Sequence, residues 1–231
     1  MHKLLSWAGI LLLVALCMSA CKKDYYIDGG LANPHYNGTI YDYLVKNPYL
    51  FDTVAYIVEK AGLKDMLEHD SVTFFAFTDQ SVGDALEDLN EIRYRSVEDS
   101  AHLADIPGEV WREFLLRYIM KGKHTANQFA RVDPNNIYAY PGINYVMAGD
   151  YILNIGLVYQ NYNNVEAVGA RILLLTDITF DPVTFRNNNN VNVASSDIQP
   201  TNGVIHALNI RHVLGFRGDF PRIAEQALQH Q

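Results

Sequence analysis

Histidine is the residue type in this chain best suited to metal chemistry, but the spacing of the histidines argues against a metal site. His206 and His212 fall on one face of a single predicted strand. Six residues of about 3.3 Å each would separate them by roughly 20 Å. His69, His102 and His124 have no neighbouring ligand at metal-type spacing. We therefore expect no metal and no cofactor, and we interpret His206 as a half-buried imidazole hydrogen-bonded to the fold. Ligand contact by His206 is the alternative.

Nucleophilic catalysis has no recognisable motif in the sequence. There is no Gly-x-Ser-x-Gly elbow and no glycine-rich phosphate loop. Two carboxylates acting together in a hydrolase would leave no local signature, so an envelope hydrolase stays as an alternative. The expectation from the residues is a protein that is not an enzyme.

Cys21 closes a segment with the layout of a bacterial export signal. Lys3 precedes an apolar stretch over residues 4–16, and small residues stand directly before Cys21. Charges from Lys22 onward cut the apolar run short of the roughly 20 residues that a membrane span needs. Residues 16–21, Leu-Cys-Met-Ser-Ala-Cys, resemble a lipobox, in which cleavage precedes a cysteine that is then acylated. An ordinary cleaved signal is the alternative.

This interpretation predicts a signal peptide over residues 1–20, a lipid on Cys21 and a flexible tether over residues 21–36. Cys17 would leave with the signal, so the folded part would contain no disulfide. Lys22, Lys23 and Asp24 are similar to tags that send some Bacteroidetes lipoproteins to the cell surface. We expect an outer-membrane lipoprotein exposed at the surface, with a periplasm-facing protein as the alternative.

The formal net charge of −8 makes nucleic acid an unexpected partner. Phosphate binding requires clustered basic residues, and the lysine pair beside the proposed lipid is the main basic cluster. Expected partners are the membrane, through the lipid anchor, and a protein or glycan ligand at the cell surface.

Apolar periodicity places the helices mainly in the first half of the chain and the strands in the second. We expect helices starting at Thr39 and over 50–62, 79–89 and 107–122, with a polar connection over 90–105. Strand patterns cover 73–77, 137–140, 145–148, 151–157, 171–176, 191–194 and 204–214. Because helices and strands are segregated, we expect an α+β fold with an antiparallel sheet.

Three of these segments, in this order, resemble the fasciclin (FAS1) domain family. Residues 73–82, Thr-Phe-Phe-Ala-Phe-Thr-Asp-Gln-Ser-Val, resemble its first signature, a strand that enters a capped helix. Residues 202–214, which begin Asn-Gly-Val-Ile-His, resemble the closing strand. Residues 116–125 resemble the Tyr-His segment of the family, with Ile119 in place of the histidine. The residues that carry the family motifs are Thr78, Asp79, Tyr118, Asn202, Gly203 and His206.

The resemblance implies one FAS1-like domain, a wedge of two small, mainly antiparallel β-sheets flanked by helices. It would span residues 37–218 and leave a C-terminal tail over residues 219–231. Such domains serve mostly in extracellular adhesion and binding. Residues 158–193 exceed what a minimal member needs and are expected to be an insertion or an extended hairpin.

Residues 159–164, Tyr-Gln-Asn-Tyr-Asn-Asn, combine aromatic faces with amides, the mixture that stacks on sugar rings and bonds their hydroxyls. The candidate glycan contacts are Tyr159, Tyr162 and Asn163. An exposed hairpin turn is the alternative, since Asn tolerates left-handed backbone angles. The sequence thus predicts a lipid-anchored binding or adhesion protein of the cell envelope, with a glycan-binding accessory of polysaccharide uptake as the runner-up.

Overall fold

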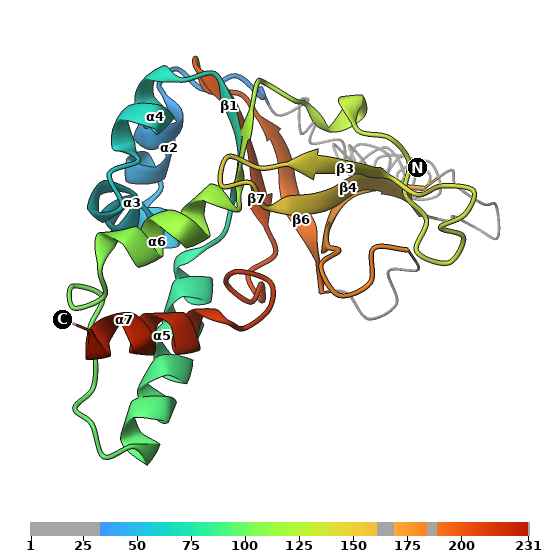
Figure 1. Cartoon of the computed structure of the whole chain (residues 1–231). Coiled ribbons are helices and arrows are strands. Elements are labelled where there is room, and N and C mark those ends of the chain that lie inside the picture. Colours follow the sequence, from blue (N-terminus) through green and yellow to red (C-terminus); the bar gives the residue numbers. More distant parts are fainter. Residues whose placement is uncertain (1–32, 161–168, 184–188, 231) are drawn as a thin grey trace, which may run out of the picture. The chain divides into compact units, whose positions relative to one another are not determined.

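A seven-stranded mixed sheet forms the framework of the fold (Figure 1). The computed structural model describes residues 33–160, 169–183 and 189–230, and the chain from Pro34 onward forms one unit. The strand order is β2-β1-β7-β6-β5-β4-β3. The strands are β1 (Val72–Ala76), β2 (Ile119–Lys121), β3 (Ile143–Val146), β4 (Ile152–Tyr159), β5 (Arg171–Asp177), β6 (Asn190–Ile198) and β7 (Gly203–Leu208).

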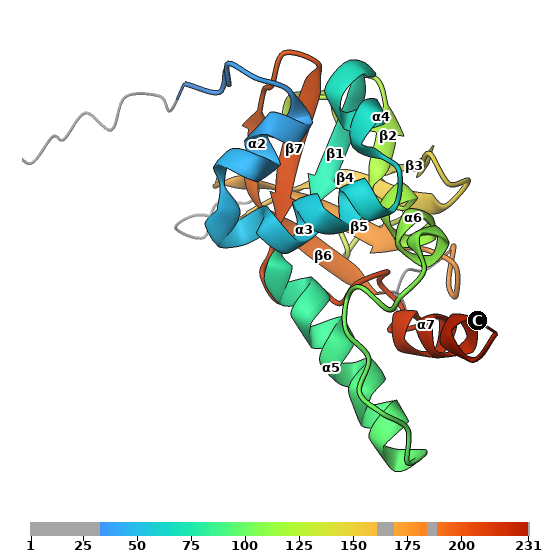
Figure 2. The same cartoon turned by 90° about the vertical axis from the view of Figure 1, so that its left-hand side faces the viewer.

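Helices pack against the β1–β7 end of this sheet, and Figure 2 shows α2, α3 and α4 in front of these two strands. Apart from a 3-10 turn, η1 (Ala126–Gln128), the described helices are α2 (Ile40–Lys46), α3 (Pro48–Lys60), α4 (Lys64–His69), α5 (Asp79–Arg95), α6 (Gly108–Leu116) and α7 (Phe220–Gln229). Thr39 caps α2 as predicted, through a reciprocal capping box with Asp42. Gly62 has a φ of +65°, the left-handed angle expected just after α3.

The sheet is mainly antiparallel, as expected, and its centre contains one parallel strand pair. Strands β1 and β7 pair in parallel from Val72↔Gly203 to Ala76↔Ala207, while the other strand pairs are antiparallel. All five residues of β1 are buried, as is typical of a strand covered on both faces. The α+β class itself is confirmed, since helices and strands remain largely segregated along the chain.

Strand β6 joins the two sheets that the resemblance implied into one. Residues Asn190 to Asn192 pair with β5, whereas the strand pairs with β7 from Val193 to Ile198. Two register shifts interrupt the second pairing, and such bulges bend and twist a strand. The two expected sheets are therefore two halves of a continuous sheet that meet at β6.

Two predicted helix boundaries are wrong. Helix α5 continues to Arg95, through a stretch expected to be a polar connection, because its late turns lie in solvent and need no apolar face. Helix α6 ends at Leu116, so Ile119 belongs to strand β2 and pairs with Phe74. A buried apolar residue satisfies a helix pattern and a short strand equally well.

Two predicted strands are also corrected. Residues 137–140 form a turn, in which the N–H groups of Ala139 and Tyr140 donate to the carbonyl of Asn136, both at 3.1 Å. The closing strand ends at Leu208 instead of Leu214, because Asn209 starts a turn that accepts the N–H of His212 at 3.0 Å. His206 and His212 therefore do not share a strand. Within residues 158–193, the described parts of β4, β5 and β6 pair as antiparallel neighbours, in agreement with the extended hairpin expected there.

The segment 219–231, expected to be a tail, contains helix α7 and belongs to the folded unit. Phe220 is fully buried and packs 4.8 Å from the ring of Trp111 and 5.1 Å from that of Phe114. Glu225 forms an ion pair with Arg93 of α5 at 2.8 Å. Apolar residues at positions 220, 223, 224, 227 and 228 recur at three and four residues, which makes the helix amphipathic, a signal that the sequence prediction missed.

Across residues 33–160, 169–183 and 189–230, the helices are too short or too polar to cross a bilayer.

Candidate binding site

The Thr78-Asp79 pair of the first signature serves a neighbouring helix as well as its own. Thr78 occupies the N-cap position of α5 but makes no side-chain capping bond. The carboxylate of Asp79 instead accepts the backbone N–H groups of Asp52 and Val54, both at 3.0 Å. These two groups lie just after Phe51, where α3 is kinked. Asp79 therefore caps the continuation of α3 after the kink.

The neighbouring carboxyls of Asp79 and Asp52 shift each other's pKa in opposite directions. Partial burial and the Asp52 carboxyl raise the pKa of Asp79 to about 6. The hydrogen bond with Asp79 lowers the pKa of Asp52. Both carboxyls are occupied with backbone N–H groups of α3, and neither lines the pocket described below. We give this pair a structural role.

Asn202 and Gly203 tie the start of β7 to two helices. The Oδ1 atom of Asn202 accepts the N–H of Ile40 at 2.8 Å, and Nδ2 donates to the carbonyls of Leu67 and Asp70 at 3.0 and 3.1 Å. Gly203 has no room for a side chain, because a Cβ atom would lie 2.2 Å from the carbonyl oxygen of Val72.

His206 is fully buried, and both of its ring nitrogens have partners in the protein. Nε2 donates to the carbonyl of His124 at 2.9 Å, and Nδ1 accepts the N–H of Asp197 at 3.3 Å. The ring stacks on Phe75 at 5.3 Å. Burial lowers the pKa of His206, so it is neutral near pH 7. The structure thus places His206 deeper than the half-buried position expected, but with the hydrogen bonds that the prediction required.

Tyr118 is also fully buried, and its hydroxyl connects α6 to the loop that follows β7. The N–H of Gly215 donates to the Tyr118 hydroxyl at 2.7 Å, and the hydroxyl lies 2.6 Å from Nε2 of His212. Arg117 reinforces this link through the carbonyl of Gly215 and the carboxylate of Asp219, both at 3.1 Å. The loop over residues 209–219 is therefore fixed to α6 by side chains.

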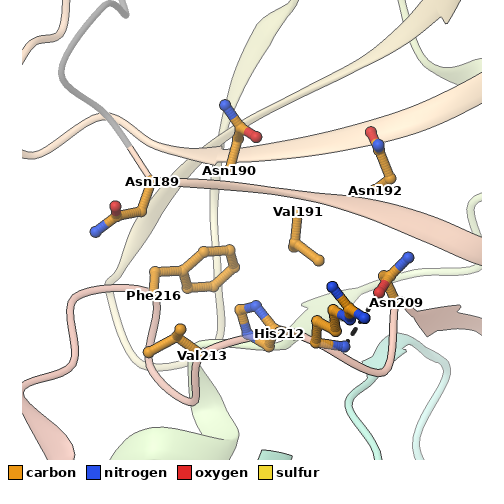
Figure 3. A pocket seen from close by; sticks show the side chains of 9 residues that line it. Asn189, Asn190, Val191, Asn192, Asn209, His212, Val213 and Phe216 are labelled. Atoms are coloured by element: carbon orange, nitrogen blue, oxygen red, sulfur yellow. Dashed lines mark hydrogen bonds between the residues drawn. The ribbon is translucent and has the colours of Figure 1, made fainter.

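A pocket lies between this loop and the first residues of β6 (Figure 3). Its volume is about 280 Å³, near the lower end of the range for small-molecule sites. The pocket exists because β7 pairs with β6 only from Val193 onward, so residues 190–192 have a neighbouring strand on one side alone. The lining residues, hereafter the β6–loop pocket, are Asn189, Asn190, Val191, Asn192, Asn209, Arg211, His212, Val213 and Phe216.

Strand alternation decides which of these side chains face the pocket. Figure 3 shows Val191 pointing toward His212 and Phe216, while Asn190 and Asn192 point to the opposite side of β6. Val191, His212 and Phe216 are buried and form the floor, whereas Val213 is half exposed. Asn189, Asn209 and Arg211 are exposed at the rim. The floor is thus mostly apolar and the rim is polar.

The hydrogen bonds of Tyr118 determine the protonation of His212. The Tyr118 hydroxyl is fully buried, and its neighbours among the described residues are the N–H of Gly215, which can only donate, and Nε2 of His212. Nε2 is therefore the acceptor that is available to the hydroxyl proton. Burial lowers the pKa of His212 to about 3, so the ring is neutral near pH 7. A neutral imidazole that accepts at Nε2 carries its proton on Nδ1. Among the described residues Nδ1 has no hydrogen-bond partner, and His212 lines the pocket.

Comparison with known proteins identifies the family. The sequence matches the fasciclin domain over residues 50–212, which is well over half of the chain. The chain belongs to the fasciclin domain family. A solved FAS1 domain pair from the insect cell adhesion molecule fasciclin I is similar at 15% identity, with a TM-score of 0.47. The match covers 74% of this chain and 49% of that structure, so the chain spans about half of its length. A search of curated proteins finds no match.

The motif residues of this fasciclin domain are occupied with holding the fold. Thr78, Tyr118, Gly203 and His206 are buried, and Asn202 is bonded to three backbone groups. Five of the six motif positions therefore offer little surface to a partner, and Asp79 is only partly exposed. Ile119, which replaces the family histidine, is fully buried in β2.

Tyr159, the predicted glycan contact that the structure describes, does not line the β6–loop pocket. Tyr159 ends β4, and its ring lies 5.3 Å from the guanidinium of Arg131 and 5.0 Å from that of Arg171. Asn190 of the pocket pairs with Thr176 of β5, and Thr176 pairs with Asn154 of β4. Tyr159 lies five residues further along β4 than Asn154, which corresponds to about 16 Å. Tyr162 and Asn163 lie outside the described residues, as does Cys21.

In the described part of the chain, no three His, Cys, Asp or Glu side chains lie close enough together to hold a metal ion. The residues that sequence reasoning missed are Arg211, His212 and Phe216 of the pocket. The turn-forming residues Asn209, Gly215 and Gly218 could have indicated that β7 ends before residue 209. They could also have indicated that Arg211, His212 and Phe216 belong to a loop.

Proposed function

We propose that this chain is a lipid-anchored binding protein of the bacterial cell envelope, which holds a fasciclin domain outside the membrane to attach a partner. The observation that carries the proposal is the fasciclin match over residues 50–212, because fasciclin domains are found in cell adhesion proteins and are typically not enzymes. The Leu-Cys-Met-Ser-Ala-Cys segment over residues 16–21 supports the anchor.

The distribution of polar groups supports binding over catalysis. Four of the motif side chains bond within the protein, as they would in a scaffold, namely those of Asp79, Tyr118, Asn202 and His206. The buried hydroxyl of Thr78 has no hydrogen-bond partner among the described residues. The β6–loop pocket leaves donors at its floor and rim without partners among the described residues. A small open pocket of this kind can hold part of a ligand, while the surrounding surface meets the rest of it.

Anchoring is tested by labelling cells that express the full chain with an alkyne palmitate analogue. We expect label on the wild type and on Cys17→Ser, and none on Cys21→Ser. Cys17 is a matched control because it lies in the same segment and should be removed with the signal. Equal labelling of both variants, or no labelling of the wild type, would refute a lipid on Cys21.

Surface display is tested by adding protease to intact cells. Digestion of the fasciclin domain before the cells are opened supports an outward orientation, and protection until lysis refutes it. Adhesion is tested by comparing attachment of cells carrying the wild type or Cys21→Ser to surfaces coated with envelope material of neighbouring cells or with matrix protein. Equal attachment by both would show that the anchored domain does not mediate adhesion.

A further inference from the structure

The side chains that face the β6–loop pocket are mainly hydrogen-bond donors. Nδ1–H of His212 has no partner among the described residues, as shown above. The Oδ1 atom of Asn209 accepts the backbone N–H of Arg211 at 3.1 Å, which leaves its amide NH₂ group to donate outward. Asn189 adds an exposed amide at the opposite rim. A ligand group that accepts several hydrogen bonds at once fits such a lining.

Arg211 gives the rim a positive charge. Among the described residues the guanidinium of Arg211 has no ion-pair partner. The bond from Arg211 to Asn209 is donated by the backbone N–H, so it does not involve the guanidinium. No carboxylate lines this pocket. Asp84 and Asp88 of α5 line a smaller neighbouring hollow that also includes Arg211, so they reduce this charge without facing the β6–loop pocket.

Size and apolar surface narrow the ligand further. A volume of about 280 Å³ suits one small ring better than a long chain segment. Val191, Val213 and Phe216 offer the apolar contact that the C–H face of a sugar ring requires. The net charge of −8 would slow the approach of an anion, but screening over about 8 Å at physiological salt limits that effect once the ligand is in the pocket.

We propose that the β6–loop pocket binds one uronic acid residue of a glycan, with its carboxylate at Arg211 and Asn209, its ring over Val191 and Val213, and a ring or hydroxyl oxygen at Nδ1–H of His212. This assignment rests on the proposed binding function and names the ligand class of its pocket. The lining favours a carboxylated sugar over a neutral one because it contains donors and one cation, while the nearest carboxylates, Asp84 and Asp88, lie in the neighbouring hollow.

The test is an NMR titration of the ¹⁵N-labelled full-length chain in detergent micelles. The probes are the methyl glycosides of glucuronate and galacturonate, with methyl glucoside and methyl galactoside as neutral counterparts of the same shape. We expect an acidic sugar to bind at least about tenfold more tightly than its neutral counterpart, which is the order expected for one charge-assisted contact. Equal affinity for both members of each pair overturns the proposal.

The side-chain nitrogens of the two buried histidines provide an internal control. Before ligand is added, His212 should show the Nδ1–H tautomer. Addition of the acidic sugar should shift Nδ1 of His212 and leave His206, whose nitrogens are both bonded within the protein, unchanged. Absence of any His212 shift at tens of millimolar sugar, or an equal shift of His206, contradicts binding in this pocket.

Exposed variants separate recognition from folding. Arg211→Gln should abolish the preference for the acidic sugar, and Asn189→Ala should weaken binding several-fold, while far-UV circular dichroism stays unchanged. Arg222→Gln on α7 is the matched control, since Arg222 is exposed, bonded to Gln226 and absent from the pocket. An Arg211→Gln variant that keeps the full acidic preference overturns the assignment.

A glutamate-containing tripeptide is titrated in parallel. If it shifts His212 at lower concentration than either uronide, the pocket recognises a protein carboxylate and the glycan proposal falls. Sugar binding in the absence of surface display or attachment would refute the adhesion proposal alone. Attachment with no sugar binding would refute only the ligand assigned to this pocket.

Discussion

Two buried histidines mark two regions of this molecule that use polar groups differently. Around His206, at the β1–β7 centre, both ring nitrogens are bonded to the protein. Around His212, below the start of β6, one nitrogen is bonded to Tyr118 and the other faces a pocket. Both rings are nearly inaccessible and neutral, so burial alone does not distinguish a scaffold residue from a binding residue. The distinction lies in Nδ1 of His212, which has no hydrogen-bond partner among the described residues, whereas both ring nitrogens of His206 are bonded.

The largest expected effect belongs to the scaffold region. Gly203→Ala should destabilise the domain by about 3 kcal/mol or more, because the new Cβ would lie 2.2 Å from the Val72 carbonyl and force β1 and β7 apart. Gly83→Ala on α5 is the control, since a Cβ there meets nothing within 4 Å. It should stabilise the helix by up to about 1 kcal/mol. Urea unfolding measures both, and similar values for the two variants would contradict the close packing at Gly203.

A smaller effect is expected where the two regions meet. Tyr118→Phe keeps the buried ring but leaves the N–H of Gly215 and Nε2 of His212 without a partner, which should cost about 1–3 kcal/mol. Tyr138→Phe is the control, because Tyr138 is 85% exposed. An equally small loss for both variants in thermal and urea unfolding would show that the hydroxyl does not connect α6 to the loop.

The pH dependence of stability should reflect the buried histidines. The pKa of His212 is about 3 in the folded protein and about 6.5 when unfolded, so the unfolded state binds the proton first. Its contribution is fully present above pH 6.5 and is lost as the pH falls toward 3, by up to about 1.4 kcal/mol per pH unit.

His212→Gln isolates this contribution, since other titrating groups, including Asp79, cancel in the difference from the wild type. Unfolding free energies measured from pH 7 to pH 5 should fall less steeply in the variant. Parallel curves for the two proteins would mean that folding does not lower the pKa of His212.

The smallest effect on stability is expected at the pocket rim. Arg211→Gln and Asn189→Ala should each change the free energy of unfolding by less than about 0.5 kcal/mol, because both side chains are exposed and lack side-chain partners among the described residues. A larger loss in urea unfolding would assign them to the scaffold and remove the contrast between the two regions.

Sequence patterns predicted the parts of this fold that depend on local chemistry. The Thr39 cap, the stop at Gly62 and the buried strand 72–76 follow from residue types and their immediate neighbours. The parallel pairing of β1 with β7 could not be predicted from local patterns, because it joins residues from opposite ends of the domain. The family resemblance supplied the overall fold that local patterns left open.

The pocket was harder to foresee for a physical reason. Apolar, strand-forming residues continue beyond Leu208 at Ile210, Val213 and Leu214, so the strand pattern in the sequence extends past the real end of β7. The tautomer of His212 depends on Tyr118 and Gly215, which lie in different elements. Donor groups that face a ligand are visible only after such distant partners have been assigned.

The parallel β1–β7 pair also has a consequence for the order of folding. Strand β1 follows α4 early in the chain, but its central neighbour is the last strand, which ends at Leu208. A growing polypeptide cannot complete the middle of its sheet until nearly the whole domain has been made. Contacts between such distant residues slow folding. A nascent chain that stops before residue 203 would lack β7 and leave one side of β1 unpaired. Such a truncated chain would expose the apolar residues of β1, which are buried in the complete domain.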